Sequence, residues 1–443
     1  MAERGSFTNK MGFVLATAGA AFGLGNIWRF PYLVAENGGG LFLLVYLLLV
    51  FTVGIALILT ESAVGRRAGA GVLSAFSKIS KRWTFLGYLS FFIPLLILSF
   101  YAVVGGWVLQ YGLQFLLGNG LEMASPGYFA GFSADPLVPT VLALIFLVLT
   151  AGIVIRGVQK GVEKTCRFVM PTLLVMLIIL AGYCICMPGG LEGVAYMFYP
   201  DFSEFTPGLL IAALGQVFFS LTIGAGLIIT YGSYLPKKEN LVTSARAVAV
   251  FDVAVAVLAA MMVIPAVFAF SGGSPETLGS GPDLMFIVLP QVFVSFPFGN
   301  LIGALFFILV FFAAITSSVA IYEVGISSLI DRFGLSRKRA VLTLSLPLAA
   351  AVVLVSLGFG VLDFIQINGL GIFAFLDYLT NNILLPISAF LMSIVAGWVI
   401  KPKGIIDEIC AEGVTFRGQK IFSLALRYLI PAVILVILIT GFL

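Results

Sequence analysis

The chain has 443 residues, of which 61% are hydrophobic and only 10% are charged, and its formal net charge is +4. Soluble globular domains are typically about 25% charged, so this composition excludes an ordinary soluble protein. The chain has no histidine, and its four cysteines form no Cys-x-x-Cys pair. Serine–histidine–aspartate triads, histidine-dependent zinc sites and a disulfide framework are therefore not expected.

Apolar segments recur along the whole chain, each long enough to cross about 30 Å of hydrocarbon as an α-helix. The sequence predicts an all-α polytopic membrane protein with 11 transmembrane helices in a single membrane domain over residues 1–443. The predicted spans are residues 11–35, 40–64, 84–117, 136–155, 166–187, 208–235, 241–270, 298–330, 336–358, 371–398 and 421–442.

Basic residues are distributed unequally between the loops. Of the 24 Lys and Arg residues, all but Arg29 fall in the N-terminal segment or in loops that follow even-numbered spans. Loops rich in Lys and Arg stay on the cytoplasmic side, so we predict a cytoplasmic N-terminus and an extracellular C-terminus in the cell inner (plasma) membrane. The net charge then reflects this bias within a lipid bilayer, and no nucleic-acid partner is expected.

The first predicted span is interrupted at its centre. Residues 19–26 read GAAFGLGN, and each glycine weakens a helix by roughly 1 kcal/mol relative to alanine. Unpaired backbone groups inside a membrane are tolerated where they line a cavity or are buried in protein. The interruption predicts freed carbonyls for a cation, freed amides for an anion, and the Asn26 side chain as a ligand. The alternative is a glycine-rich face that packs against a neighbouring helix.

The sixth predicted span repeats this pattern. Residues 215–226 read GQVFFSLTIGAG, with hydroxyls and glycines at the centre. Discontinuous helices at matching positions in two halves of a chain are typical of secondary transporters built from inverted repeats. Here the repeats would cover about residues 11–187 and 208–398, followed by the helix 421–442. The sites for substrate and ions are expected where the two breaks face each other.

Ionisable residues inside a membrane are costly and usually functional. The candidates for such a role are Arg29, Glu61, Asp252, Glu323 and Asp377. We expect Glu61 and Glu323 to be structural and to hydrogen-bond opened backbone on neighbouring spans.

The eighth span carries Thr316 and Ser317, whose hydroxyls can serve a hard cation beside the Ala313 carbonyl. Each hydroxyl can instead bond back to its own helix. The apolar loop 271–297 lies outside the predicted membrane and is expected to fold back as a lid.

Three long stretches resemble motifs of the neurotransmitter:sodium symporter family, which has the LeuT-like fold. They read AGAAFGLGNIWRFPYLVAENGGG, GQVFFSLTIGAG followed by ITYGSY, and FFAAITSSVAI. The chain resembles the bacterial amino-acid branch over essentially its whole length. The resemblance implies a 5+5 inverted repeat with unwound helices 1 and 6, and a sodium-coupled symporter rather than an enzyme. Its substrates would be neutral, hydrophobic or aromatic L-amino acids, a monomer would be sufficient, and the oligomeric state is left open.

The resemblance also implies two co-transported sodium ions and no organic cofactor. One sodium site would use backbone carbonyls and hydroxyls of Gly19, Phe22, Ala313, Thr316 and Ser317. The other would use the substrate carboxylate together with Ala21, Asn26, Ser220 and Asp252. Chloride-dependent relatives are asparagine-like at Asp252, so a fixed carboxylate predicts independence of chloride. We also hypothesise that Asp252 takes up a proton when sodium leaves.

The substrate pocket follows from the same resemblance. The substrate carboxylate would meet amides near Leu24 and Gly25 and the Tyr101 hydroxyl, and the amine would meet carbonyls near Ala21 and Phe219. The residues implied around the rest of the substrate are Ile97, Val104, Ser220, Thr222, Ala225, Ser317 and Ile321. Two ion pairs resemble the family's gates, Arg29 with Asp377 outside and Arg4 with Asp331 inside.

Three alternatives remain at this point. An intramembrane enzyme without histidine would need Ser–Lys or paired-aspartate chemistry, and no lysine lies in the interior of a predicted span. An amino-acid sensor on the same scaffold would bind substrate without turnover. A proton-driven carrier of similar fold is less favoured, because Asn26, Thr316 and Ser317 suit sodium.

Overall fold

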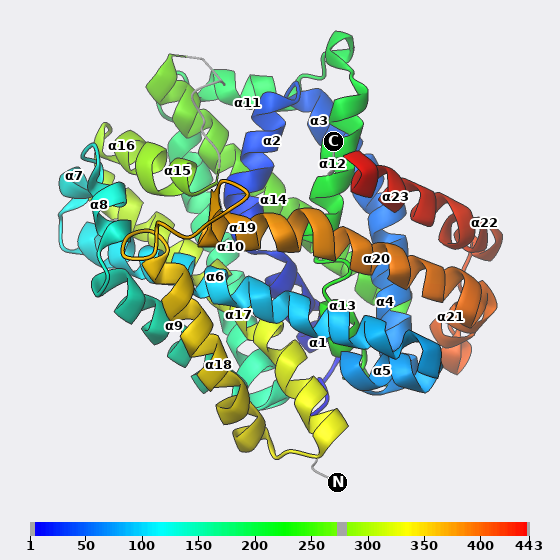
Figure 1. The fold of residues 1–443 in the computed structure, drawn as a ribbon. Helices are drawn as coiled ribbons and strands as arrows, with labels where there is room; N and C mark the ends of the chain where they lie inside the picture. Colours follow the sequence, from blue (N-terminus) through cyan, green and yellow to red (C-terminus); the bar gives the residue numbers. More distant parts are fainter. Residues whose placement is uncertain (1–4, 273–280, 441–443) are drawn as a thin grey trace.

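The computed structural model describes residues 5–272 and 281–440, which fold into a helical bundle (Figure 1). The helices of the first half are α1 Lys10–Ala21, α2 Phe30–Glu36, α3 Gly40–Leu49, α4 Ile55–Ala68, α5 Val72–Ile79, α6 Thr84–Leu116, α7 Gly120–Met123, α8 Tyr128–Ala134, α9 Val138–Val154, α10 Lys164–Ile185 and α11 Gly190–Phe198. Those of the second half are α12 Pro207–Ser220, α13 Leu227–Gly232, α14 Leu241–Ser271, α15 Gly281–Asp283, α16 Leu289–Val294, α17 Gly299–Phe333, α18 Arg337–Leu357, α19 Ile372–Tyr378, α20 Leu385–Ile394, α21 Lys401–Ile409, α22 Gln419–Leu424 and α23 Ile430–Thr440.

Wider, π-helical turns join several of these helices into longer rods. They are Gly25–Arg29, Val50–Gly54, Val158–Glu163, Leu284–Val288, Leu379–Leu384, Val395–Ile400 and Ala425–Leu429. Single 3-10 turns lie at Lys81–Trp83, Phe202–Glu204 and Ala411–Gly413. The short strands β1 (Gln366–Ile367) and β2 (Leu370–Gly371) form an antiparallel hairpin, an addition to the all-α prediction.

The membrane-spanning architecture agrees with the sequence. Among the described residues, eight helical segments are long and apolar enough to cross a membrane, and the number rises to ten if two bent pairs each count as one span. One of these pairs is the predicted first span, in which the two halves meet at 57°. The predicted span 208–235 is divided between α12 and α13. The number of spans, predicted as 11, therefore stays a prediction.

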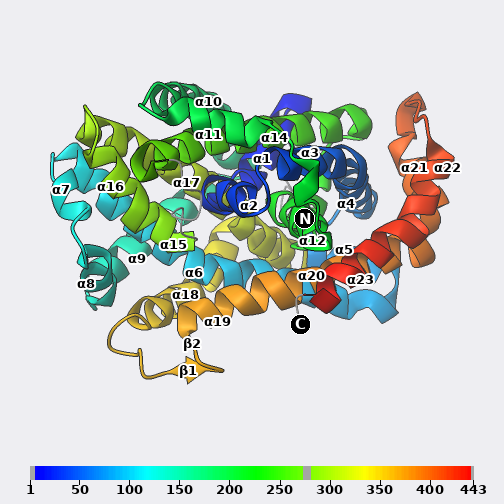
Figure 2. The same ribbon diagram turned by 90° about the horizontal axis from the view of Figure 1, so that it is seen from above.

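The two long helices α6 and α17 form the centre of the bundle. They pack along each other, and in both helices most of the apolar membrane-crossing segment is buried. Helix α1, the first half of the broken span, packs against both α17 and α14. Viewed from above, α2 and α12 lie next to each other inside the ring of outer helices (Figure 2), and the two helices are in contact. The two breaks are thus placed in the protein interior.

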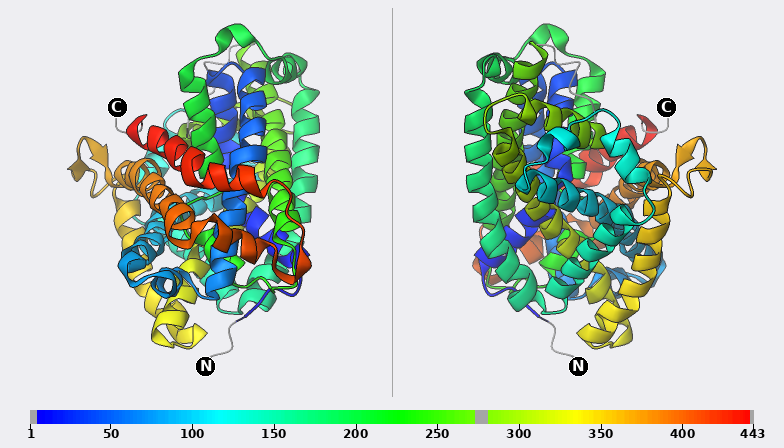
Figure 3. Two further views of the ribbon diagram at one scale, coloured as in Figure 1. Left: turned by 90° about the vertical axis from the view of Figure 1, so that its right-hand side faces the viewer. Right: turned by 90° about the vertical axis from the view of Figure 1, so that its left-hand side faces the viewer.

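The last helices, α20 to α23, lie on one flank of this bundle (orange to red in Figure 3). The span predicted to end at 398 continues through a π-helical turn into α21, which ends at Ile409. Lys401, at the start of α21, has a positive φ of 67° and marks the change of direction there.

The described part of the apolar loop, residues 281–297, folds back onto the bundle as expected. It forms α15, a π-helical turn and α16 rather than irregular chain. Tyr111 of α6 donates a hydrogen bond to the Phe286 carbonyl (2.9 Å), and the Phe286 ring packs edge-on against Trp107.

Candidate functional site

The first break lies between α1 and the π-helical turn at Gly25–Arg29. Phe22 leaves the helical conformation (φ −76°, ψ 93°), so carbonyls of the last turn of α1 lose their partners within the helix. The Ser317 hydroxyl of α17 lies 3.3 Å from the Gly19 carbonyl, 3.2 Å from Ala20 and 3.1 Å from Phe22. A hydroxyl donates only one hydrogen bond at a time, so the Ser317 hydroxyl cannot satisfy all three carbonyl oxygens.

Thr316 lies beside this convergence but bonds to its own helix. Its hydroxyl donates to the carbonyls of Phe312 (3.1 Å) and Ala313 (3.0 Å). The two neighbouring residues therefore follow different alternatives. The Ser317 hydroxyl contacts carbonyls of α1, whereas the Thr316 hydroxyl bonds to carbonyls of its own helix. The structure brings the predicted oxygens of Gly19, Phe22 and Ser317 to one place between α1 and α17, whereas the Ala313 carbonyl bonds to Thr316 of its own helix.

The second break, residues 221–226, is held by side chains from other helices. Thr222, Gly224 and Gly226 all have positive φ, and Thr222 is the unusual member because it carries a β-branched side chain (φ 50°). Glu61 of α4 accepts a hydrogen bond from the Gly224 amide (2.8 Å), and Ser388 of α20 donates to the Gly224 carbonyl (2.7 Å). The expectation that Glu61 bonds opened backbone is confirmed.

Asp252 joins the two broken helices. Its carboxylate accepts hydrogen bonds from Asn26 of the first break (2.9 Å) and from Ser220 at the end of α12 (2.8 and 2.9 Å). Ser220 also lies 3.2 Å from the Asn26 carbonyl oxygen. All three side chains are buried. The sequence placed these residues at one site, although they are separated by up to 226 positions.

Two further buried polar residues, one on α3 and one on α12, were not predicted. The Tyr46 hydroxyl of α3 donates to Asp252 (3.3 Å), and the ring is fully buried. Gln216, one turn before Ser220, is also fully buried, and neither its amide nitrogen nor its carbonyl oxygen has a hydrogen-bond partner. Each is a polar residue within an apolar run of a predicted span, which is the signal that could have identified them.

A cavity of about 300 Å³ lies between the two breaks and α6. Predicted substrate residues that line it are Ala21, Leu24, Gly25, Ile97, Tyr101, Val104, Phe219, Thr222, Ala225, Ser317 and Ile321. Ser220 does not line it and lies in the Asp252 cluster. The sequence had not indicated the apolar residues Trp28, Pro94, Phe100, Leu227 and Phe373, which also line the wall.

Backbone amides of the first break face this cavity. The Leu24 amide donates to the Tyr101 hydroxyl oxygen (3.3 Å). A Cβ atom on Gly25 would come within 2.1 Å of the Phe219 ring, so only glycine fits there. The Leu24 amide and the Tyr101 phenol therefore form one polar point of the cavity, Arg29 and Asp377 add charged groups to the wall, and much of the remaining wall is apolar.

Comparison with known proteins agrees with this geometry. The sequence model that describes the sodium:neurotransmitter symporter family matches residues 4–121 and 134–443 of this chain. The chain belongs to this family. It is 35% identical to the uncharacterized sodium-dependent transporter YhdH of Bacillus subtilis (strain 168), over 97% of this chain and 96% of the relative. It is 28% identical to the human sodium- and chloride-dependent GABA transporter 2, over 97% of this chain and 79% of the relative.

The structure resembles the crystal structure of MhsT in complex with L-phenylalanine. The TM-score is 0.88, the sequences are 38% identical, and the match covers 99% of this chain and 100% of that one. The symporter is accordingly a multi-pass, sodium-coupled secondary transporter with the LeuT fold, and not an enzyme.

On the outer side of the cavity, the symporter has Arg29 and Asp377 in the same wall. No ion pair joins these two side chains in the described part of the chain. Arg29 instead lies over the Phe219 ring, with 4.6 Å between the guanidinium carbon and the ring centroid. Asp377 accepts a hydrogen bond from Asn381 (2.7 Å). The structure thus brings the predicted outer pair into one cavity without pairing it.

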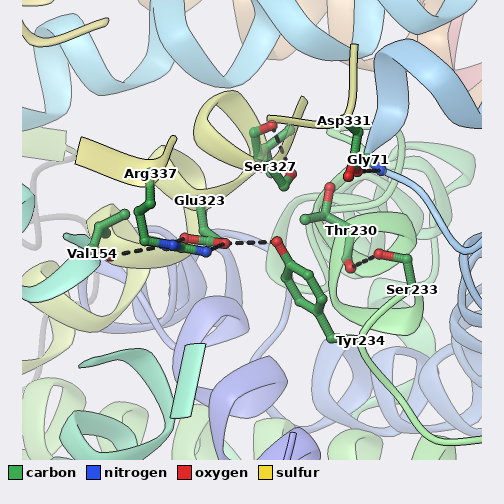
Figure 4. Close-up of polar contacts among 10 residues, drawn as sticks. Gly71, Val154, Thr230, Ser233, Tyr234, Glu323, Ser327, Asp331 and Arg337 are labelled. Carbon is green, nitrogen blue, oxygen red and sulfur yellow. Dashed lines mark hydrogen bonds and ion pairs between the residues drawn. The ribbon is translucent and has the colours of Figure 1, made fainter. Parts of the chain in front are cut away.

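A polar network surrounds Glu323, on the side where the inner gate is predicted (Figure 4). Arg337 of α18 binds Glu323 of α17 with two parallel hydrogen bonds of 2.8 Å and also donates to the Val154 carbonyl (2.9 Å). The Tyr234 hydroxyl donates to the same carboxylate (2.7 Å). The expectation that Glu323 bonds opened backbone is wrong, because its carboxylate is used by a guanidinium and a phenol.

Of the predicted inner gate pair, Arg4 lies outside the described residues. Its predicted partner Asp331 accepts a hydrogen bond from the Gly71 amide (2.6 Å). The buried Phe7 ring packs edge-on against Tyr231 and Tyr234, and its amide donates to the Tyr234 carbonyl (3.1 Å). This aromatic cluster holds the segment that precedes α1 against residues 231–234.

Proposed function

We propose that this symporter imports neutral, hydrophobic or aromatic L-amino acids with sodium, by alternating access and without chloride. The observation that carries the proposal is the cavity between the two breaks, in which the Leu24 amide and Tyr101 lie beside a wall formed largely by apolar side chains. An α-amino acid with a large apolar side chain complements both parts. The bound L-phenylalanine of MhsT, which this chain resembles throughout, supports the same class.

The substrate carboxylate is proposed to bind at the amides of Leu24 and Gly25 and at the Tyr101 hydroxyl. The amine would then be near the carbonyls of Ala21, Phe219 and Thr222, with Ser317 close by. The side chain would extend between Ile97, Val104, Ala225 and Ile321. Monoamine carriers of the family have an aspartate near Gly23. Its absence here favours a substrate that brings its own carboxylate.

Two sodium ions are proposed as co-substrates. One would bind between α1 and α17 at the carbonyls of Gly19, Phe22 and Ala313 and the hydroxyls of Thr316 and Ser317. These are neutral oxygens, the ligand type that hard cations prefer. The other would bind at the Ala21 carbonyl, Asn26, Ser220, Asp252 and the substrate carboxylate. Sharing the carboxylate makes sodium and substrate increase each other's affinity.

Asp252 is proposed to supply the negative charge that chloride provides in chloride-dependent relatives. It is buried and accepts hydrogen bonds from Asn26, Ser220 and Tyr46, and these three donors stabilise the charged carboxylate. When sodium leaves, this carboxylate would take up a proton, so that the return step exports a proton. The inward sodium gradient drives uptake. The membrane potential adds about 2.3 kcal/mol of free energy for each charge that enters per 100 mV.

In the proposed cycle, the outer gate closes when Arg29 moves from the Phe219 ring to Asp377. The inner gate opens when the network of Glu323, Arg337 and Tyr234 separates. The N-terminus would lie in the cytoplasm and the C-terminus outside the cell, in the inner membrane, as the distribution of basic residues predicts.

Uptake of labelled L-tryptophan into proteoliposomes tests the proposal. We expect accumulation with an inward sodium gradient, none with potassium, and competition by phenylalanine, tyrosine and leucine but not by lysine or glutamate. Replacing chloride with gluconate should leave the rate unchanged. Sodium-dependent binding without accumulation would indicate a sensor, and uptake independent of sodium would contradict the ion sites.

A further inference from the structure

A second hollow, unrelated to the substrate cavity, lies on the flank formed by the last helices. Its volume is about 550 Å³, and it opens between α21 and the start of the final span. In Figure 2, α21 and α22 stand at the edge of the molecule, away from α1 and α2. The residues that line the hollow are Lys403, Ile406, Asp407, Gln419, Lys420, Ser423, Leu424, Arg427 and Tyr428.

The hollow has an excess of positive charge. Lys403, Lys420 and Arg427 face a single acidic residue, Asp407. Within the described ranges, none of these three cations forms an ion pair. The Arg427 Nε atom is buried and lacks a hydrogen-bond partner. Three unneutralised cations in one concave site provide the charge complement of a phosphate group.

The surroundings of the hollow match the boundary between hydrocarbon and water. Ile421, Leu424 and Tyr428 beside it are 77%, 64% and 54% exposed. The Trp398 ring packs edge-on against Tyr428, and the Arg427 guanidinium lies 6.0 Å from its centroid. Exposed tryptophan and tyrosine with long basic side chains are typical of the headgroup level of a membrane. Apolar residues next to the cations leave room for acyl chains along the same surface.

We propose that this hollow binds the phosphodiester headgroup of an anionic phospholipid from the cytoplasmic leaflet. Lys403 and Lys420 would contact the phosphate oxygens from two helices, and Arg427 would satisfy its buried Nε atom with the same group. Gln419 and Ser423 would bind the glycerol hydroxyls. The acyl chains would continue over Leu424 and Ile421. A basic pocket between membrane helices on the cytoplasmic side is chemically suited to such a ligand.

A bound lipid would brace α21 on its outer side. On its inner side α21 is already fixed to α4, because Arg66 donates to the Glu408 carboxylate (2.7 Å) and to the Glu408 carbonyl. The lipid would therefore connect α21 with the final span, a connection that the protein alone makes with few polar contacts.

Native mass spectrometry of the full-length transporter in detergent tests the proposal, with added phosphatidylglycerol, phosphatidylcholine or glycerol 3-phosphate. We expect a tight phosphatidylglycerol adduct. At about 1 kcal/mol for each basic residue near the headgroups, the double substitution Lys403→Gln with Lys420→Gln should weaken this adduct roughly thirtyfold. Lys160→Gln with Lys338→Gln removes the same charge from exposed positions elsewhere and should leave it unchanged.

Both lysines of the site are exposed, so the double variant is expected to fold. Lys403→Arg with Lys420→Arg, which keeps the charge, should retain the adduct. Equal binding of phosphatidylglycerol by the two glutamine variants would overturn the proposal. So would equal binding of phosphatidylcholine, or displacement of the lipid by glycerol 3-phosphate at similar concentration, which would indicate a site for free anions. None of these readouts depends on transport.

Discussion

The two broken helices carry the same sequence signature but differ in what their backbone does. At the first break the carbonyls of Gly19, Ala20 and Phe22 converge on one hydroxyl, that of Ser317. At the second break the amide and carbonyl of Gly224 are each bound by a side chain, Glu61 and Ser388. One break has more acceptors than donors, and the other has both groups satisfied.

This difference separates ion binding from structural support. Carbonyl oxygens without enough hydrogen-bond donors, as at the first break, are stabilised when a cation binds. A backbone whose amide and carbonyl are both hydrogen-bonded, as at the second break, keeps its conformation with or without a ligand. We infer that substitutions at the first break change sodium affinity and that substitutions around the second change stability. Because Asp252 contacts both breaks, a substitution of Asp252 should change sodium affinity and stability together.

The largest effect is expected for Asp252→Ala. Asn26, Ser220 and Tyr46 would lose their shared acceptor, and each buried donor without a partner costs about 1–3 kcal/mol. We expect sodium-dependent uptake to be abolished and thermal stability in detergent to fall. Asp252→Asn keeps the size and one acceptor, so it should fold and should lose the proton-coupled internal alkalinisation. Alkalinisation that persists in Asp252→Asn would contradict the antiport hypothesis.

Glu61→Ala is expected to destabilise the protein by about 1–3 kcal/mol, because the Gly224 amide would be left unpaired inside the bundle. Sodium titration of the purified variant should give the wild-type midpoint. The matched control is Glu61→Gln, which retains an oxygen acceptor and should be close to wild type in unfolding temperature. A changed sodium midpoint with unchanged stability would reverse the roles assigned to the two breaks.

Ser317→Ala should raise the half-saturating sodium concentration by about tenfold, which corresponds to about 1.4 kcal/mol. Without sodium, Ser317→Ala should lower the free energy of unfolding by only about 0.5–1.5 kcal/mol, since one hydroxyl donates one hydrogen bond. The control is Ser318→Ala, because the buried Ser318 hydroxyl bonds only to the Ala314 carbonyl of its own helix (2.6 Å). Equal sodium midpoints for the two variants would remove Ser317 from the ion site.

The smallest effect is expected for Ser388→Ala. The Gly224 carbonyl would lose one neutral hydrogen bond, at a cost of about 0.5–1.5 kcal/mol in unfolding free energy. Sodium affinity and the competitor ranking in uptake should not change. Thermal unfolding and proteoliposome transport on the same preparation would measure both, and a loss of transport without a loss of stability would be the contradicting result.

Much of the cavity follows from helical spacing. Ile97, Tyr101 and Val104 are separated by four and three positions, so they face one side of α6, and the cavity lies on that side. The contact of Glu323 with Arg337 could not be predicted in this way. The sequence pattern placed Arg337 in a loop, and only the packing of α17 against α18 turns its guanidinium towards the buried carboxylate.

The sequence alone determined that this chain crosses a membrane several times, that its first and sixth spans are broken, and which polar residues lie near the breaks. These properties depend on apolar length and on glycine, which act locally. The tertiary structure decided which partner each polar group has. Tyr46 binds Asp252, Ser388 binds Gly224, and Gln216 is enclosed without a partner. Such choices depend on how distant helices pack, because a buried hydrogen bond requires its two atoms to lie within about 3 Å of each other.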